Sequence, residues 1–190
     1  ERIHRREGAD LVTSTHLRTA LGDRQPRISQ TAWIAPGAVV VGAVSIGEDS
    51  SVFYTSVLRG DCHEITIGAR TNVQDGVVIH VDDEHPTVVG EDVSIGHRAV
   101  LHGCTIGDGA LVGMSATVMS GAVVGAGAMV AAGALVTPGK TIPPGTLAAG
   151  VPAKVVRDLT ESEKAHLVHN AAHYLELAAD HRRAHTESSR

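Results

Sequence analysis

The chain has 190 residues, a formal net charge of −5, and a composition that is 43% hydrophobic but only 2% aromatic. An acidic balance without a basic stripe argues against nucleic acid as a partner, no apolar run is long enough to cross a membrane, and two cysteines make no disulfide framework. Because 21 residues are glycine, the core must be built from small and β-branched side chains, which favours a thin, regular structure. The first ten residues lack the apolar core of a signal peptide, so we expect a cytoplasmic location.

Residues 1–23 are polar and patternless, and we expect a loose N-terminal arm there. From Ile34 onward, aliphatic residues recur at every sixth position, often followed by glycine or alanine. Neither a helix nor a flat strand has a period of six, whereas short strands joined by tight glycine turns do. The series are Ile34, Val40, Ile46, Val52, Leu58; Ile67, Val73, Ile79; Val89, Ile95; and Val100, Ile106, Val112, Val118, Val124, Val130, Val136.

Three such units complete one coil of a triangular solenoid with about 18 residues per turn, and stacked coils bury one continuous aliphatic column. The repeat, which we place at residues 24–158, resembles the hexapeptide-repeat proteins. That resemblance implies a left-handed parallel β-helix. The predicted fold class is therefore an all-β solenoid.

A C-terminal helix is predicted at residues 159–182, followed by a tail at 183–190. Thr160 and Glu163 have the spacing of a capping box at the start of this helix. An apolar face recurs along it and predicts packing against the solenoid or against a neighbouring subunit. That face comprises Leu167, Ala171, Tyr174 and Ala178.

Two histidines of the repeat region are predicted to stack. Ile79 and Leu101 are 22 residues apart, four more than one coil, and the surplus fits a polar loop at residues 82–86. With this loop removed, His80 and His102 each follow an equivalent inward aliphatic residue. Their backbones are then expected about 4.8 Å apart, so that both imidazoles can share one metal ion.

His97 lies only five residues before His102, nearly one side of the prism away. If it is a ligand of the same ion, it must come from another subunit, which a threefold arrangement of solenoids would allow. The alternative is that these are three unrelated surface histidines among the twelve of the chain. The stacking register of His80 favours the metal site.

Over about residues 28–174, the chain resembles the γ-class carbonic anhydrases, on the motifs "VLRGD", "TNVQDGVVIH" and "IGHRAVLHGC". The resemblance implies a homotrimer that interconverts CO2 and bicarbonate at interface metals, zinc with iron or cobalt as alternatives. It implies ligands His80 and His102 from one chain and His97 from its neighbour. It further implies that Arg59 pairs with Asp61 and that the polar side chains of Asn72, Gln74 and Asp75 order water and substrate.

The chain departs from the archetype of that family at two places. Cys62 stands where the archetype has a glutamate, and the acidic loop after the first ligand is short. Glu84 and His85 of this loop are candidate proton shuttles. Tyr174 either reaches the active-site pocket or fills the contact face of the helix.

Other functions remain open on the sequence alone. The "GVPAKVVR" segment is shared with hexapeptide acyltransferases that use an acyl-CoA, and a non-catalytic metal-binding trimeric scaffold is a third hypothesis. His169 and His173 lie four apart on the predicted helix and could bind a metal. The glutamate of a zinc-protease motif is missing between them, so we interpret them as part of an exposed polar face.

Overall fold

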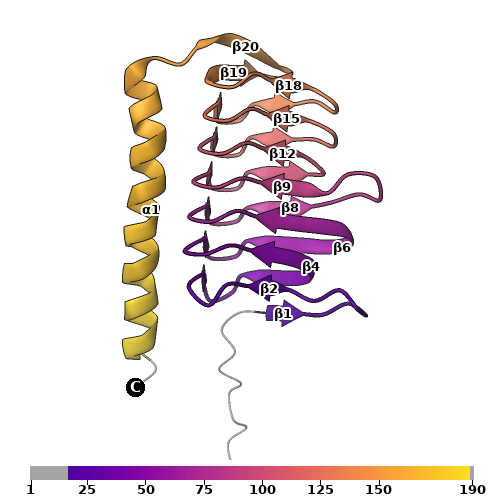
Figure 1. The fold of residues 1–190 in the computed structure, drawn as a ribbon, viewed down its shortest axis with the longest axis vertical. Helices are drawn as coiled ribbons and strands as arrows, with labels where there is room; N and C mark the ends of the chain where they lie inside the picture. Colours follow the sequence, from indigo (N-terminus) through magenta and orange to yellow (C-terminus); the bar gives the residue numbers. More distant parts are fainter. Residues whose placement is uncertain (1–16, 189–190) are drawn as a thin grey trace, which may run out of the picture.

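A computed structural model of the protein describes residues 17–188. In this part of the chain, short parallel strands stack into a solenoid, and one long helix lies along its side (Figure 1). This confirms the predicted fold class. No helix in the described part is both long enough and apolar enough to cross a bilayer.

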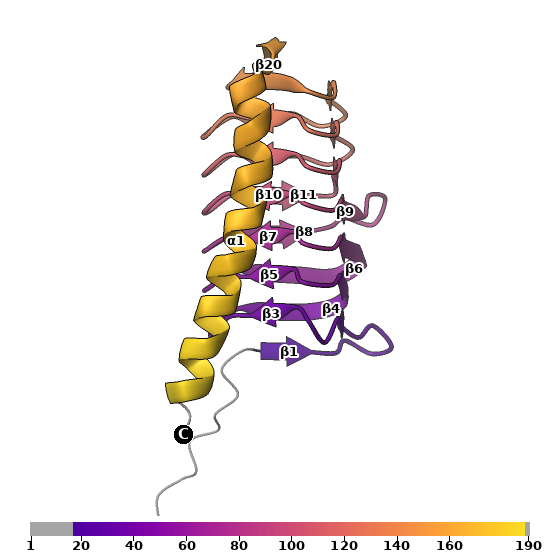
Figure 2. The same ribbon diagram turned by 60° about the vertical axis from the view of Figure 1, so that its left-hand side comes forward.

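The first sheet lies beneath the helix α1 (Glu161–Ser188), as Figure 2 shows, and we call it the helix face. Its strands are β3 (Trp33–Ile34), β5 (Ser51–Val52), β7 (Asn72–Val73), β10 (Ser94–Ile95), β13 (Leu111–Val112), β16 (Met129–Val130), β19 (Thr146–Gly150) and β20 (Ala153–Asp158). Only the last pair, β19 with β20, is antiparallel.

The second sheet bends into two faces, because the first part of β6 (Val57–Ile67) pairs with β8 and its last part pairs with β9. The face that continues from β8 (Val78–His80) contains β11 (Val100–His102), β14 (Thr117–Val118) and β17 (Leu135–Val136), and we call it the histidine face. The third face contains β9 (Thr87–Val89), β12 (Thr105–Ile106), β15 (Val123–Val124) and β18 (Thr141–Ile142). Below β6, the strand β4 (Val39–Ile46) pairs with β1 (Leu17–Thr19) and β2 (Arg27–Ile28).

The sixfold aliphatic series fills the interior of the solenoid as one continuous column. One member of the predicted series is wrong: Val100 is only partly buried, and Leu101 points into the core instead. The cause is a short side of the prism, since the large aliphatic core residue after Leu101 is Ile106, only five residues later. The periodicity resumes from there.

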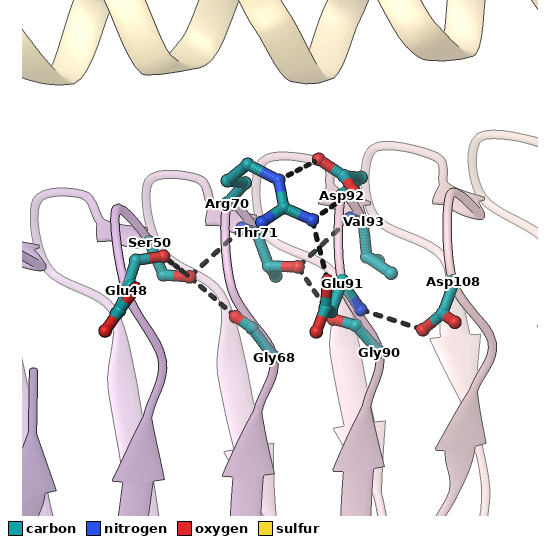
Figure 3. A network of polar contacts seen from close by, with 10 residues as sticks. All are labelled: Glu48, Ser50, Gly68, Arg70, Thr71, Gly90, Glu91, Asp92, Val93 and Asp108. Atoms are coloured by element: carbon teal, nitrogen blue, oxygen red, sulfur yellow. Dashed lines mark hydrogen bonds and ion pairs between the residues drawn. The ribbon is translucent and has the colours of Figure 1, made fainter.

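Polar side chains join neighbouring coils at the corner that faces α1 (Figure 3). Arg70 donates two hydrogen bonds to the carboxylate of Asp92, at 2.8 and 2.7 Å, and a third to Glu91 at 2.7 Å. Asp108, one coil further on, accepts the backbone N–H of Glu91 at 2.9 Å. This ladder holds successive turns in register where the backbone leaves the sheet.

Both ends of the chain extend the ordered structure beyond the expected boundaries. The strand β1 pairs with β4, so residues 17–19 of the expected arm belong to the solenoid, while residues 1–16 lie outside the described part. The helix begins with the predicted capping box, in which Thr160 and Glu163 exchange hydrogen bonds at 3.3 and 2.8 Å. It continues to Ser188, past the expected end at 182, because its last turns pack on the solenoid.

Candidate metal centre

His80 and His102 stand at equivalent positions on the histidine face. They end β8 and β11, and the two strands pair so that His102 lies opposite His80, which confirms the predicted stacking. His80 Nδ1 and His102 Nε2 are 3.1 Å apart. Two nitrogens that bind one tetrahedral ion at 2.0–2.1 Å are roughly 3.3 Å apart, so this pair fits a shared metal without rearrangement.

The second nitrogen of His80 is held by Asp61 of β6. The distance from His80 Nε2 to Asp61 Oδ1 is 2.9 Å, and the carboxylate also forms the predicted ion pair with Arg59. Burial opposes ionisation of Asp61, but the hydrogen bonds from His80 and Arg59 outweigh it and lower the pKa to about 2. Asp61 is therefore ionised and accepts a hydrogen bond from the Nε2–H of His80, which leaves Nδ1 of His80 free for a metal.

His102 is held by two residues that the sequence did not point to. Its Nδ1 lies 2.9 Å from Ser120 Oγ, and Ser120 in turn donates to Asp82 Oδ2 at 2.5 Å. The hydrogen bond from Ser120 contributes most to holding the pKa of Asp82 well below its usual range. In the sequence, Ser120 follows His102 by 18 residues, the expected length of one coil, and this spacing could have pointed to Ser120.

The loop at residues 82–86 folds back on this site. His85 Nδ1 lies 3.0 Å from Asp82 Oδ1, whereas Glu84 is exposed and contacts Asp82 only through its backbone N–H. Of the two shuttle candidates, His85 therefore belongs to the hydrogen-bonded chain that reaches His102. The exposed Cys62 lies beside Asp61 and His80, and desolvation together with the charges of Asp61 and Asp83 raises the pKa of its thiol.

His97 lies at the opposite edge of the histidine face, in the turn between β10 and β11. Five residues of extended chain span up to about 16 Å, so the edge of His97 is well separated from that of His102. The contacts of His97 are Asp75 Oδ2, 2.8 Å from Nδ1, and the hydroxyl of Tyr174, 3.3 Å from Nε2. Tyr174 thus reaches His97 from α1.

Gln74 and Asn72 complete the surroundings of His97. The side-chain oxygen of Gln74 accepts the backbone N–H of His97 at 3.2 Å, and its amide donates to Asn72 Oδ1 at 3.0 Å. Asn72 is anchored by Ser94 at 3.0 Å. Both amides are buried, so their orientation is set by the fold.

The structure divides the candidate residues into two groups on one chain. The histidine-pair group is formed by Arg59, Asp61, His80, His102, Asp82 and Ser120; the His97 group is formed by Asn72, Gln74, Asp75, His97 and Tyr174. Each group lies at a different edge of the same face. Neither group alone supplies three imidazoles.

Known proteins resemble this chain in both sequence and structure. Residues 86–118 and 103–138 match the family described as "Bacterial transferase hexapeptide (six repeats)". A solved structure of a hexapeptide transferase family protein from Anaplasma phagocytophilum is 42% identical, superposes with a TM-score of 0.84, and aligns over 86% of this chain and 97% of its own.

Two relatives carry a more specific name. A Methanocaldococcus jannaschii protein named "Probable carbonic anhydrase" is 54% identical over 80% of this chain and 95% of its own length. The Arabidopsis thaliana protein "Gamma carbonic anhydrase 2, mitochondrial" is 42% identical over 87% of this chain, which spans 62% of that protein. With these relatives and the paired histidines of its second sheet, the chain belongs to the γ-class carbonic anhydrase family of hexapeptide-repeat proteins.

Proposed function

We propose that this chain catalyses the reversible hydration of CO2 to bicarbonate, at a metal centre shared by neighbouring subunits of a homotrimer. The observation that carries this proposal is the division into two complementary groups at opposite edges of one face. A threefold axis presents the His97 edge of one copy to the histidine-pair edge of the next, and three imidazoles then meet. A cytoplasmic location is part of the same proposal.

The ligands would be His80 and His102 of one subunit and His97 of its neighbour. Neutral imidazoles suit zinc, iron and cobalt, and three of them leave the double charge of the ion uncompensated. When bound, such an ion lowers the pKa of a water ligand to about 7 and supplies a nucleophile at neutral pH. We propose zinc, with iron and cobalt as alternatives.

Each of the three histidines has a polar partner at one ring nitrogen. Asp61 accepts from Nε2 of His80, and Ser120 accepts from Nδ1 of His102 while donating to Asp82. These acceptors hold one ring nitrogen protonated and leave the lone pair of the other for a metal. At His97, Asp75 Oδ2 lies 2.8 Å from Nδ1, on the side of the ring away from Tyr174. Such partners support metal ligands over unrelated surface histidines.

The remaining side chains of the His97 group would position the reactants. Gln74 is fixed by Asn72 and by the backbone of His97, so its amide is available to orient water or CO2 without losing rotamer entropy. The hydroxyl of Tyr174 stands beside the nitrogen of His97 that would face the neighbouring subunit. Arg59 keeps Asp61 ionised and so acts on His80 indirectly.

Subunit mixing tests the proposal. His97→Ala and His102→Ala trimers should each be inactive in CO2 hydration and low in metal. When both are unfolded together and reassembled at equal concentration, about a quarter of the sites combine an intact histidine pair with an intact His97. We expect activity and metal content to recover by that fraction.

The control mixes His102→Ala with His169→Ala, which alters an exposed histidine of α1. Here His97 is intact in every subunit, so a site should work whenever its histidine pair is intact, and about half of the sites should be active. If mixed trimers of His97→Ala and His102→Ala form without any recovery, the shared site is refuted. A stable monomer with full metal occupancy would refute it as well.

A second function is favoured by the name of the Anaplasma phagocytophilum relative, which is a hexapeptide transferase family protein. An acyltransferase should bind acyl-CoA, and its binding should not depend on the histidine pair. Titration of acetyl-CoA into wild type and into His102→Ala separates the two functions. Bound metal without hydration or acyl-CoA binding would instead support the scaffold hypothesis.

A further inference from the structure

Helix α1 meets the solenoid through a cluster that we call the seam. It contains all four aromatic residues of the chain, together with two histidines near the end of α1; the members are Trp33, Phe53, Tyr54, Tyr174, His181 and His185. The two histidines play no part in the function proposed above. Histidine is an unusual choice for a purely apolar contact.

His181 and His185 lie four residues apart and face the same phenol. Tyr54 Oη is 2.7 Å from His181 Nδ1 and 3.0 Å from His185 Nε2. Two histidines with this spacing on a helix are a common chelating pair for transition metals. The geometry points to a second metal site, formed by His181, His185 and Tyr54, for a divalent ion that prefers imidazole, such as Cu²⁺, Ni²⁺ or Zn²⁺.

The seam holds these ligands in place before any ion arrives. The indole of Trp33 packs against both imidazoles, with ring centroids 5.6 Å from His181 and 6.5 Å from His185. Phe53 packs edge-on against His181 at 5.7 Å. Because the rings are already oriented, binding an ion costs little side-chain entropy.

The three ligands are not expected to contribute equally. Burial raises the pKa of Tyr54, and the charge of Asp75 adds to this effect, so the phenol is a neutral oxygen donor at neutral pH. Neutral phenols bind metals more weakly than imidazoles do. His181 and His185 should therefore carry most of the affinity, and Tyr54 a smaller part.

The same helix carries a matched pair for comparison. His169 and His173 have the same four-residue spacing and stack with ring centroids 6.2 Å apart, but both are exposed. Tyr174 touches the ring of His173, yet it directs its hydroxyl to His97. The pair thus shares the spacing of His181 and His185 without a converging phenol oxygen.

Trp33 is the only tryptophan of the chain, so its fluorescence reports on the proposed site. The experiment titrates Cu²⁺ or Ni²⁺ into zinc-loaded wild-type protein and follows quenching of Trp33. We expect saturable quenching with one ion per chain. His181→Ala and His185→Ala should each weaken the apparent affinity by at least about tenfold, and Tyr54→Phe by a few-fold.

His169→Ala should leave the titration unchanged. His185→Gln separates ion binding from folding, because its amide can still donate to Tyr54 while binding metals poorly; it should keep the Trp33 emission of the ion-free protein and lose the quenching. Equal quenching in wild type, His181→Ala and His185→Gln would overturn the proposal. So would an equal loss in His169→Ala, since the effect would then come from any histidine pair of the helix.

Discussion

The column inside the solenoid and the seam beneath α1 are built from different residues and in different ways. The column contains only aliphatic side chains and the thiol of Cys104, each repeated at nearly the same place in every coil. The seam contains every aromatic residue of the chain, and its contacts between α1 and the solenoid join segments more than 100 residues apart in the sequence. Stability of the column is thus distributed over many equivalent sites, whereas attachment of α1 depends on a few large side chains.

A charge inside the column should have the largest effect on stability. Val118 is fully buried on β14, and Val118→Asp would place a carboxylate where no partner or water can reach it. Its pKa would rise by several units, and we expect a loss of at least about 4 kcal/mol, a fall in Tm of roughly 10 °C. Thermal unfolding measures this change. Val123→Asp, at a partly exposed position on β15, is the control and should shift Tm by no more than about 2 °C.

Loss of an aromatic ring from the seam should release the helix and leave the solenoid folded. Trp33 packs edge-on against Phe53 at 5.1 Å and is nearly buried. Trp33→Ala should weaken the docking of α1 by about 3 kcal/mol. Hydrogen exchange should then show faster exchange in the last turns of α1, with β11 and β14 unchanged. Equal acceleration in those strands would mean that seam and column form one cooperative unit.

In the metal centre, the residue on the solenoid should matter more for metal affinity than the residue on the helix. Ser120→Ala removes the residue that orients His102 on the solenoid side, and metal affinity should fall by about tenfold or more. Tyr174→Phe removes one 3.3 Å hydrogen bond from the helix side, with a change of roughly fivefold or less. Competition with a chelator measures both. Thr105→Ala, exposed on β12, should change nothing, and a larger effect for Tyr174→Phe than for Ser120→Ala would contradict this order.

The smallest effect concerns the start of α1. Hydrogen bonds from Arg157 first, and from Thr160, lower the pKa of Glu163 to about 2, below its value in an unfolded chain. Its contribution is therefore complete above about pH 4.3 and is lost as the pH falls toward 2. Glu163→Gln should lower Tm by roughly 2 °C or less at neutral pH, and the difference should vanish near pH 2. Glu161→Gln, at an exposed neighbour, is the control; a difference from wild type that persists at pH 2 would exclude the ionic contribution.

Features of the repeat column could be predicted from the sequence better than the contacts made by loops and by the docked helix. The register of His80 over His102 followed from counting residues, because the loop adds length without changing the pairing of β8 with β11. Val100 was misplaced because one side of the prism has five residues instead of six. Asp82 and Ser120 were missed, since their role depends on how the loop folds back over His102.

By itself, the sequence determined the solenoid, its aliphatic column, the capping box of α1 and the alignment of the histidine pair. Each of these depends on residues within one or two coils, where a fixed period converts sequence spacing directly into position. Only the tertiary structure decided that His97 contacts Tyr174, that α1 continues to Ser188, and that Tyr54 meets His181 and His185. These contacts depend on the angle and depth at which one helix docks on the solenoid, and no local period encodes that geometry.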